Sequence, residues 1–182
     1  TRSFLSTLTK EQLVSRDMPL LVAYGGGVNS TALLVEMSRR AIRPDLILFA
    51  DTGGERPETY KNIEAVSDWC LKHGMPAIVT VREPGPSLEE DCLKRKALPS
   101  IAYGFKTCSQ RWKARPQDRY LKTWQPGVSY QKAFGYDVGE VRRCKESDNM
   151  RCLNVYPLIE WELDREDCEM ICRTENLKVS KS

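Results

Sequence analysis

Several features that mark special classes of protein are absent from this sequence of 182 residues. No apolar run approaches the ~20 residues that a membrane-spanning helix needs, and no signal peptide precedes the cysteines. The seven cysteines are odd in number and include no CxxC pair. Together these absences favour a cytoplasmic protein with free thiols over a secreted, disulfide-linked or membrane protein.

The charge balance and composition are also unexceptional. A net charge of +3 favours anionic ligands but does not by itself indicate nucleic acid. Hydrophobic residues make up 41% and charged residues 29%, as in soluble globular proteins. The length suits one domain, which we expect over residues 1–182, with a leading helix within 1–18 and a core over 19–175. Nothing in the sequence indicates the oligomeric state.

The first half of the chain alternates between buried strands and amphipathic helices. Strands are predicted at 20–24, 45–50 and 77–81, and helices from Asn29 to about 40 and at 58–72, with Asn29 or Ser30 as N-cap of the first. This order predicts a three-layer, doubly wound α/β fold with a mostly parallel sheet and helices on both faces. Ligands bind at the carboxyl ends of such strands, where the two polar loops lie.

The second half is less regular. We expect a helix beginning at Pro116, a strand over 129–136, a charged loop over 139–151, and a last helix over 165–173 that Asp164 caps. The single histidine, His73, precedes a helix-ending glycine, which favours a role at the helix C-terminus over catalysis.

The strongest functional signal is the turn Tyr24-Gly25-Gly26-Gly27-Val28-Asn29-Ser30-Thr31. Glycines let a backbone approach a phosphate closely, and the following helix aims free N–H groups at the anion. The hydroxyls of Ser30 and Thr31 add donors. The turn is neither a Walker A loop nor GxGxxG. The alternative is a tight strand-to-helix turn without a ligand.

Three further segments carry residues suited to chemistry. In residues 49–60, Asp51 follows a strand and can accept a hydrogen bond from a ribose or hold a metal. The alternative is that this segment is an ordinary capped loop without a ligand. In 106–116, clustered cations suit a phosphate or sulfate and would lower the pKa of the Cys108 thiol, whereas the alternative is a solvated basic helix start. In 135–143, Arg142 and Arg143 follow Gly135 in either a phosphate-binding or a merely mobile loop.

These motifs resemble, in order, those of the PP-loop superfamily. Gly26, Gly27 and Ser30 match its SGGxDS signature, in which Gly25 and Asn29 here replace the first serine and the aspartate. Residues 51–60 resemble the D-T-G-x-x-x-P-E-T-Y segment of the phosphoadenosine-phosphosulfate (PAPS) reductase family. Segments 106–116, 135–143 and 156–161 are similar to that family's basic-cysteine, G-x-R and P-L-x-x-W elements. The resemblance covers about residues 20–172.

The resemblance implies an adenine nucleotide alpha hydrolase-like fold that binds ATP, adenosine phosphosulfate or PAPS. The implied nucleotide-binding residues are Tyr24, Gly25, Gly26, Gly27, Asn29, Ser30, Thr31, Asp51, Thr52, Gly53 and Glu58. The implied catalytic residues are Cys108, Lys113, Arg142 and Arg143, and the sequence does not distinguish between the two arginines. The activity implied is cleavage of ATP at the α-phosphate, to AMP and pyrophosphate, or sulfur transfer from a sulfonucleotide.

Cofactors, partners and the class of function stay open at this stage. Magnesium is compatible with the site, although Asn29 removes a carboxylate. An iron–sulfur cluster needs about four thiolates, and the spacing of Cys108, Cys144 and Cys152 is not a recognised set. Relatives often continue into a cysteine pair, which leaves open a truncation after Ser182. Nucleic acid or a sulfur-donor protein could be the partner, and a non-catalytic nucleotide-binding module or subunit of a nucleic-acid sulfur-modification system is the alternative to an enzyme.

Overall fold

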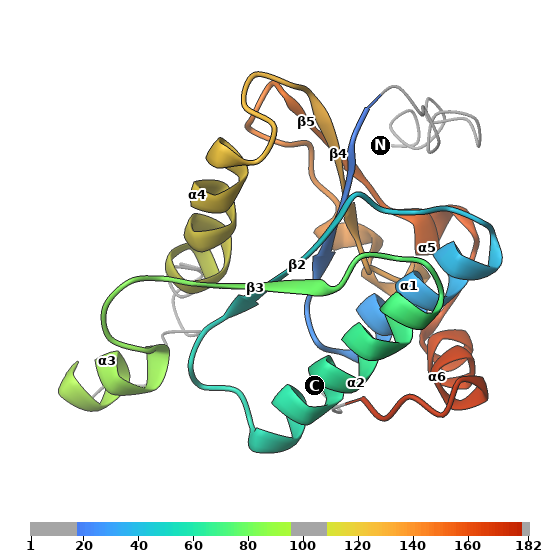
Figure 1. Ribbon diagram of the computed structural model, residues 1–182, viewed down its shortest axis with the longest axis horizontal. Coiled ribbons are helices and arrows are strands. Elements are labelled where there is room, and N and C mark those ends of the chain that lie inside the picture. Colours follow the sequence, from blue (N-terminus) through green and yellow to red (C-terminus); the bar gives the residue numbers. More distant parts are fainter. Residues whose placement is uncertain (1–17, 96–108, 180–182) are drawn as a thin grey trace.

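The computed structural model describes residues 18–95 and 109–179 (Figure 1). The expected leading helix and Cys108 lie outside these ranges. The described residues form one five-stranded sheet in the order β3-β2-β1-β4-β5, and every strand pair is parallel. The strands are β1 (Leu20–Tyr24), β2 (Leu46–Asp51), β3 (Ile78–Arg82), β4 (Tyr130–Phe134) and β5 (Cys152–Val155).

Helices connect these strands and cover both faces of the sheet. They are α1 (Val28–Arg39), α2 (Pro57–Lys72), α3 (Leu88–Arg95), α4 (Arg115–Thr123), α5 (Pro157–Glu160) and α6 (Arg165–Thr174), with a π-helical turn η2 (Ser109–Ala114) and a 3-10 helix η3 (Val138–Arg143). The predicted doubly wound α/β fold is therefore confirmed. None of the helices in the described part of the chain is long and apolar enough to cross a membrane.

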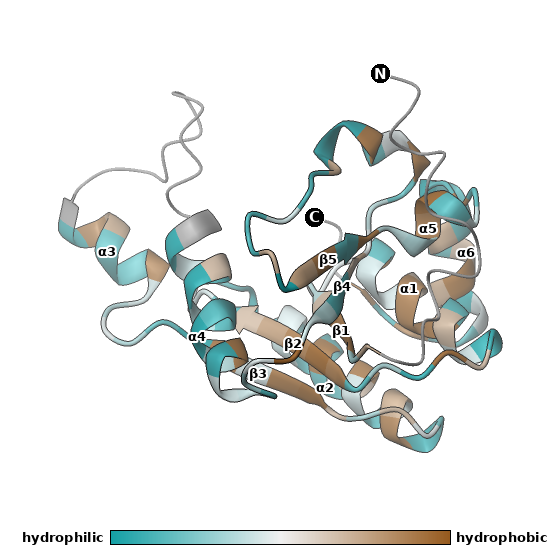
Figure 2. Cartoon of the chain, turned by 90° about the horizontal axis from the view of Figure 1, so that it is seen from above, coloured by the Kyte–Doolittle hydropathy of each residue, from teal (hydrophilic) through white to brown (hydrophobic). Residues whose placement is uncertain are grey.

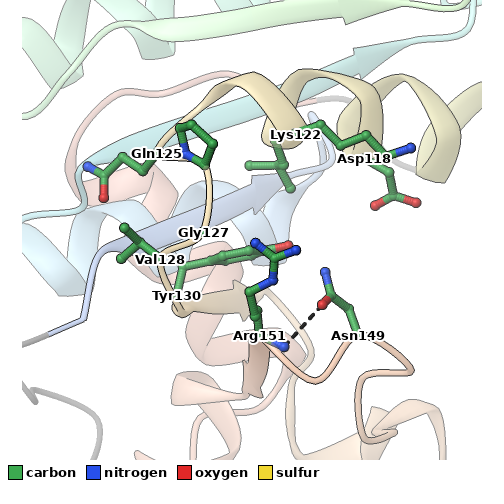
Figure 3. Close-up of a pocket in the computed structure, with 10 residues that line it drawn as sticks. Asp118, Lys122, Gln125, Gly127, Val128, Tyr130, Asn149 and Arg151 are labelled. Carbon is green, nitrogen blue, oxygen red and sulfur yellow. Dashed lines mark hydrogen bonds between the residues drawn. The ribbon is translucent and has the colours of Figure 1, made fainter.

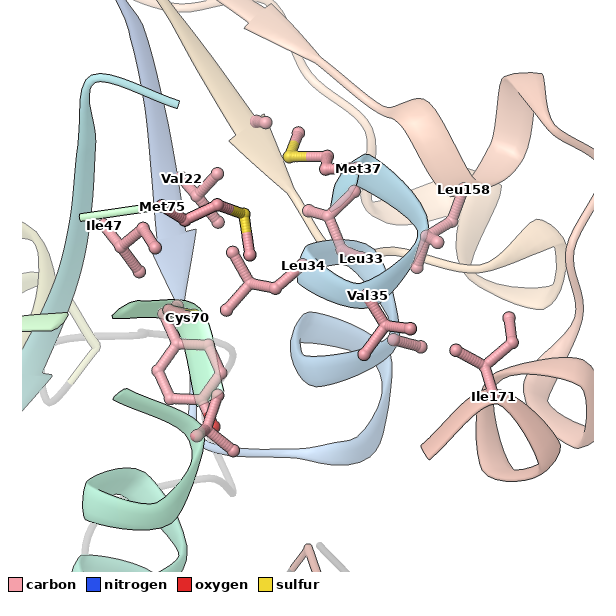
Figure 4. Close-up of a cluster of buried hydrophobic side chains, with 14 of the residues drawn as sticks. Val22, Leu33, Leu34, Val35, Met37, Ile47, Cys70, Met75, Leu158 and Ile171 are labelled. Carbon is pink, nitrogen blue, oxygen red and sulfur yellow. The ribbon is translucent and has the colours of Figure 1, made fainter. Parts of the chain in front are cut away.

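One face of the sheet holds the larger core. Side chains of β1 and β2 such as Val22 and Ile47 pack there against Leu34 of α1, with Cys70 of α2 beside them (Figure 4). Helix α6 packs on the outer side of α1 through Ile171. Because β1 and β2 are covered on both faces, their sequences are continuously apolar, which is why the sequence predicts them well. The hydrophobic colours in Figure 2 accordingly gather on the central strands.

The opposite face is covered unevenly. Leu121 of α4 packs there in a cluster with residues of β1 and β2. Farther along this face, Lys132 and Phe134 of β4 and Asn154 of β5 stay partly exposed. Residues Tyr130 and Lys132 pair with Cys152 and Asn154, so their side chains share this face.

Several boundaries differ from those expected. Gly27 rather than Asn29 or Ser30 is the N-cap of α1, because both side chains belong to the first helical turn. The expected charged loop after residue 139 begins as η3, and β5 forms where no strand was predicted. Strand β5 has only 4 residues at the sheet edge, too short to show alternation clearly. The last helix begins as predicted, with a capping box between Asp164 and Asp167.

Candidate functional site

The sheet changes direction at β1, and this switch places two turns side by side. From β1 the chain winds outward through β2 to β3, and it later returns to add β4 on the other side of β1. Ligands of open α/β sheets bind in the crevice outside the carboxyl ends of the strands at such a switch point. In this sheet the switch point lies between the turn Gly25–Gly27 after β1 and the segment that begins at Gly135 after β4, and we call this region the crevice.

The glycine turn leads directly into the N-terminus of α1. Gly26 has a φ of +76°, and a Cβ there would lie 3.6 Å from Cγ2 of Thr59, so the turn is left-handed and packed against α2. Gly25 is exposed. Gly27 caps α1 without a side chain, and the first turn of α1, which lies wholly within the described residues, has no acidic residue. The unpaired N–H groups and the positive end of the helix dipole therefore face the crevice.

The hydroxyls of this segment hold the turn together. The side chains of Ser30 and Thr31 donate to the Gly27 carbonyl at 3.1 and 3.0 Å. The Thr31 hydroxyl also shares a hydrogen bond with the Tyr24 hydroxyl, and the two residues are 0% and 2% exposed. Burial raises the pKa of Tyr24. Tyr24 and Thr31, expected at the ligand, are thus buried and hydrogen-bonded within this segment, and their contact with a ligand stays a prediction.

Asn29 takes part in a network that reaches across the crevice. Its amide nitrogen donates to Asp137 Oδ2 at 2.8 Å and to Glu140 Oε2 at 3.0 Å. Arg165 of α6 donates to the Asn29 carbonyl oxygen at 3.2 Å. Asp137 is 5% exposed and caps η3 by accepting from the Gly139 N–H at 2.8 Å. The amide of Asn29 therefore binds two carboxylates that an aspartate at this position would repel.

The segment after β4 approaches α1 closely. A Cβ at Gly135 would lie 2.7 Å from Cα and 2.8 Å from N of Ser30, so only glycine fits. The third position of the G-x-R element is Asp137, and the cations come later, at Arg142 and Arg143. Arg143 pairs with Glu140 and places its guanidinium 4.4 Å from the ring centroid of Tyr136, and both Arg142 and Arg143 are exposed.

The loop after β2 lies at the same edge. Tyr24 of β1 pairs with Phe49 of β2, so Asp51 and Gly26 follow at the same level on neighbouring strands. The Asp51 Oδ1 atom accepts from the Gly53 N–H and from the Tyr60 hydroxyl, both at 2.7 Å. Burial and this bond raise the pKa of Tyr60 to about 12. Asp51 is thereby fixed in position at the strand end.

Other expected residues of this loop are divided between interior and surface. Thr52 is buried and its carbonyl accepts from Leu88, while Gly53 has a φ of +72°. Glu58 is exposed in the first turn of α2.

The basic segment is described only from residue 109 onward. Lys113 is exposed on η2, which packs against β2 and α4. Arg111 forms an ion pair with Asp91 at 3.5 Å, and its guanidinium lies 4.4 Å from the ring centroid of Trp112. Cys108 lies outside the described residues, so its position relative to the crevice stays a prediction.

The cysteines within the described ranges are free thiols. Burial raises the pKa of Cys70 and Cys168 to about 12 and that of Cys172 to about 11, which fits small hydrophobic core residues. Cys144 and Cys152 are partly exposed. In residues 18–95 and 109–179, no group of three or more His, Cys, Asp or Glu side chains could hold a metal.

A cavity at the far end of β4 is not indicated by any motif. It has a volume of about 470 Å³ and is lined in part by Tyr130 at the amino end of the strand (Figure 3). The glycine turn instead follows the carboxyl end of the neighbouring strand β1. The lining of the cavity includes Lys122 of α4, Tyr130 of β4 and Arg151 of the segment before β5. Three separate elements form it, so sequence spacing could not indicate it.

Together the fold and the switch-point crevice define a doubly wound α/β protein with a glycine turn suited to an anionic ligand. The phosphoadenosine phosphosulfate reductase domain matches residues 19–181. The chain belongs to this family, which confirms the resemblance seen in the motifs.

Individual relatives are more distant. The uncharacterized nin region protein ORF290 of Escherichia phage lambda is 29% identical over 155 residues, and the match covers 73% of this chain and 53% of that protein. The chain thus spans about half the length of this relative. A PAPS reductase from Candida auris, solved as a phosphate complex, has a TM-score of 0.63 at 15% identity. The match covers 92% of this chain and 78% of the reductase.

A second solved structure shares the fold. The U34-tRNA thiolase NcsA from Methanococcus maripaludis, with its [4Fe-4S] cluster, has a TM-score of 0.59 at 13% identity. The match covers 91% of this chain and 59% of the thiolase. At these identities the two structures establish the shared fold alone.

Proposed function

We propose that this chain binds an adenine nucleotide, either ATP or a sulfonucleotide, by its phosphates at the glycine turn and uses it in sulfur transfer. The observation that carries the proposal is the N-terminus of α1, where Gly27 offers no capping side chain and the exposed Gly25 leaves the approach open. Such a terminus stabilises a phosphate through N–H groups and the helix dipole. Membership of the PAPS reductase family supports this choice of anion.

The neighbouring residues fit roles around such a nucleotide. Asp51, held by Gly53 and Tyr60, can accept from a ribose hydroxyl at the adjoining strand end. Arg142 and Arg143 can offset charge that develops on the phosphates. Magnesium would enter with the phosphates. The described residues contain no group of three or more His, Cys, Asp or Glu side chains that could hold the ion without them.

Two reactions are compatible with this arrangement. With ATP, an acceptor oxygen attacks the α-phosphorus, the bond to the bridging oxygen breaks and pyrophosphate leaves, so that AMP stays on the acceptor until it is displaced. With a sulfonucleotide, a thiolate attacks the sulfur and the nucleotide leaves with its phosphate oxygen. We assign Cys108 as the candidate thiol and Lys113 as the neighbouring cation.

A non-catalytic nucleotide-binding module is the second candidate. It is favoured by Asn29, whose amide stands where the motif has a carboxylate and is held by Asp137 and Glu140. Formation of AMP and pyrophosphate from ATP, or of the free nucleotide and a protein-bound S-sulfonate from PAPS, separates the two. Turnover that is lost in Cys108→Ala with unchanged affinity supports the enzyme. Unchanged turnover in that variant removes Cys108 from the mechanism.

The nucleotide proposal is tested by calorimetric titration with ATP, adenosine phosphosulfate and PAPS, each with and without magnesium. Gly25 is the informative position, because a Cβ there meets only Ser30 Oγ at 3.9 Å and the fold is not disturbed. Gly25→Asp should weaken binding at least tenfold through repulsion of the phosphates. Gly25→Ser, which restores the motif's serine, should bind as well as the wild type or better. No binding of any of the three nucleotides would refute the proposal.

A further inference from the structure

We propose that a strip along β4 and β5 is a binding track for a single-stranded nucleic acid, which would be the acceptor in the proposed sulfur transfer. The β4 strip consists of Tyr130, Lys132, Phe134, Tyr136 and Tyr156 on the α4 side of the sheet. It runs from the cavity at the amino end of β4 to the glycine-turn crevice. Its role as an acceptor site rests on the proposed function, whereas the binding itself does not.

Three aromatic rings form the end nearest the crevice. The ring centroids of Phe134, Tyr136 and Tyr156 lie 5.6–5.8 Å apart in every pair, with interplanar angles of 14–26°. The three separations are nearly equal, so the ring centroids form an almost equilateral triangle and the ring planes have similar orientations. A stacked column would instead place the two outer rings about twice as far apart as neighbouring rings. The three residues are each partly exposed. They offer apolar, aromatic contact area of the kind on which nucleobases stack.

The cluster is fixed in place from both sides. The Tyr156 hydroxyl donates to the Lys145 carbonyl at 2.7 Å and accepts from the Lys145 N–H at 2.8 Å. Tyr136 directly follows Gly135, whose close approach to Ser30 ties this end of the strip to the start of α1. A base on this cluster would therefore lie next to the segment that carries the glycine turn.

Cations accompany the rings along the strip. The Lys132 Nζ atom lies 5.5 Å from the centroid of Phe134, and the guanidinium of Arg143 lies 4.4 Å from that of Tyr136. Glu140 pairs with Arg143 and offsets part of its charge. Cations beside aromatic rings bind a phosphate backbone while the rings take the bases.

The other end of the strip opens into the cavity of about 470 Å³ (Figure 3). Tyr130 is one wall, Lys122 and Arg151 add positive charge, and Asp118 is the acidic residue of the lining. A strand advances about 3.3 Å per residue, so Tyr130 and Phe134 are about 13 Å apart. That distance is about four times the ~3.4 Å rise of stacked nucleotides, so an extended single strand would span it with fewer than four nucleotides. The strip and cavity thus have the length and composition of a short single-strand site.

The partial exposure of the three rings favours binding of unpaired bases over binding of a duplex. The rings are only partly exposed and lie on the sheet face that α4 covers in part, so a base must be unstacked to reach them. A duplex would offer its phosphates to the cations but no base faces to the rings.

The test measures fluorescence anisotropy of labelled 12-nucleotide single strands, DNA and RNA, and of the matching duplex, against the whole chain. We expect single strands to bind more tightly than the duplex. Tyr136→Ala should weaken single-strand binding roughly tenfold through loss of stacking. Lys122→Glu with Arg151→Glu, which alters only the cavity end, should weaken it by a similar factor and lower its salt dependence. Lys72→Glu, an exposed charge reversal on α2, is the matched control and should have little effect.

Nucleotide binding measured on the same samples separates this inference from the proposed function. The Lys122→Glu, Arg151→Glu protein should bind ATP or PAPS as the wild type does, which also shows that it is folded. Nucleotide binding without single-strand binding overturns the track and points to a protein partner. Equal affinity for duplex and single strand also overturns it, since charge alone would explain the binding. Single-strand binding without any nucleotide binding keeps the track but removes its role as acceptor site.

Discussion

At the scale of single residues, Asn29 decides how the crevice is held together. Its amide nitrogen binds Asp137 and Glu140, and its carbonyl oxygen accepts from Arg165. One side chain thereby joins the first turn of α1 to η3 and to α6. Only an amide can donate to two carboxylates and accept from a guanidinium at once.

The first prediction is that restoring the motif's aspartate harms this protein. Asn29→Asp should lower the free energy of unfolding by about 1–3 kcal/mol, because the buried Asp137 loses a donor and faces a like charge. Nucleotide affinity should fall as well, since η3 is no longer held at the crevice. Chemical denaturation and calorimetric titration measure the two effects.

A compensating change distinguishes this explanation from a general defect. The double variant Asn29→Asp, Asp137→Asn exchanges the two groups and should recover most of the lost stability. If Asn29→Asp alone is as stable as the wild type and binds nucleotide better, the hydrogen-bond network has no structural role. Asn29 would then only mark the loss of the aspartate that the family motif has at this position.

The sequence indicates contiguous motifs better than the contacts between them. The glycine turn, Asp51 and Gly135 each belong to a contiguous motif and lie at the same edge of the sheet, while their part in ligand binding stays a prediction. The partners of Asn29 could not be found, because Asp137 lies more than a hundred positions away and only the pairing of β1 with β4 brings it near. Likewise, the burial of Tyr24 and Thr31 depends on how α1 packs against the strand.

At the scale of elements, the contact between β4 and α1 determines the width of the crevice. Gly135 ends the strand and lies against the backbone of Ser30. Backbone atoms cannot rotate away as a side chain can, so the two elements approach as closely as the missing Cβ allows.

The second prediction is that Gly135→Ala separates β4 from α1. An added Cβ would lie 2.7 Å from Cα of Ser30, and relieving this overlap should cost about 1–3 kcal/mol of stability. Nucleotide affinity should also decline, because the crevice opens. Gly54→Ala is the control, since a Cβ there meets only Thr52 Oγ1 at 3.9 Å. An unchanged melting curve for Gly135→Ala would show that the two elements are not in contact.

Element prediction from the sequence succeeds where one pattern dominates. Strand β1 and helix α2 have strong apolar patterns and were placed to within about a residue. Strand β5, helix α5 and the turn η3 were missed or treated as irregular, because each is short and is defined by its neighbours. Local sequence carries too little signal for elements of 4–6 residues.

At the scale of the whole molecule, one carboxyl group links stability to pH. Glu160, at the end of α5, is partly buried, and its Oε2 atom has no hydrogen-bond partner among the described residues. Burial raises the pKa of Glu160 from 4.5 to about 7. Between these values the folded protein binds a proton that the unfolded chain has released, so stability falls as the pH rises through this window.

The third prediction is that Glu160→Gln stabilises the protein at pH 8 more than at pH 5. At pH 8 the variant removes a partly buried charge, whereas at pH 5 Glu160 is already protonated and little changes. The increase in melting temperature of Glu160→Gln over the wild type should be larger at pH 8 than at pH 5 by about 2 °C or more. Glu64→Gln on the exposed side of α2 is the control. An equal gain at both pH values would contradict the raised pKa.

The position of β1 at the centre of the sheet also has a consequence for synthesis on the ribosome. Leu20 of β1 pairs with Gln131 of β4, about 110 positions later in the chain. At about 5–20 residues per second, β1 waits roughly 5–20 seconds for this neighbour after it has been made. During that interval a nascent sheet of β1, β2 and β3 presents an open, apolar edge on which another strand could pair wrongly. Translation speed before residue 130 should therefore affect the yield of folded protein.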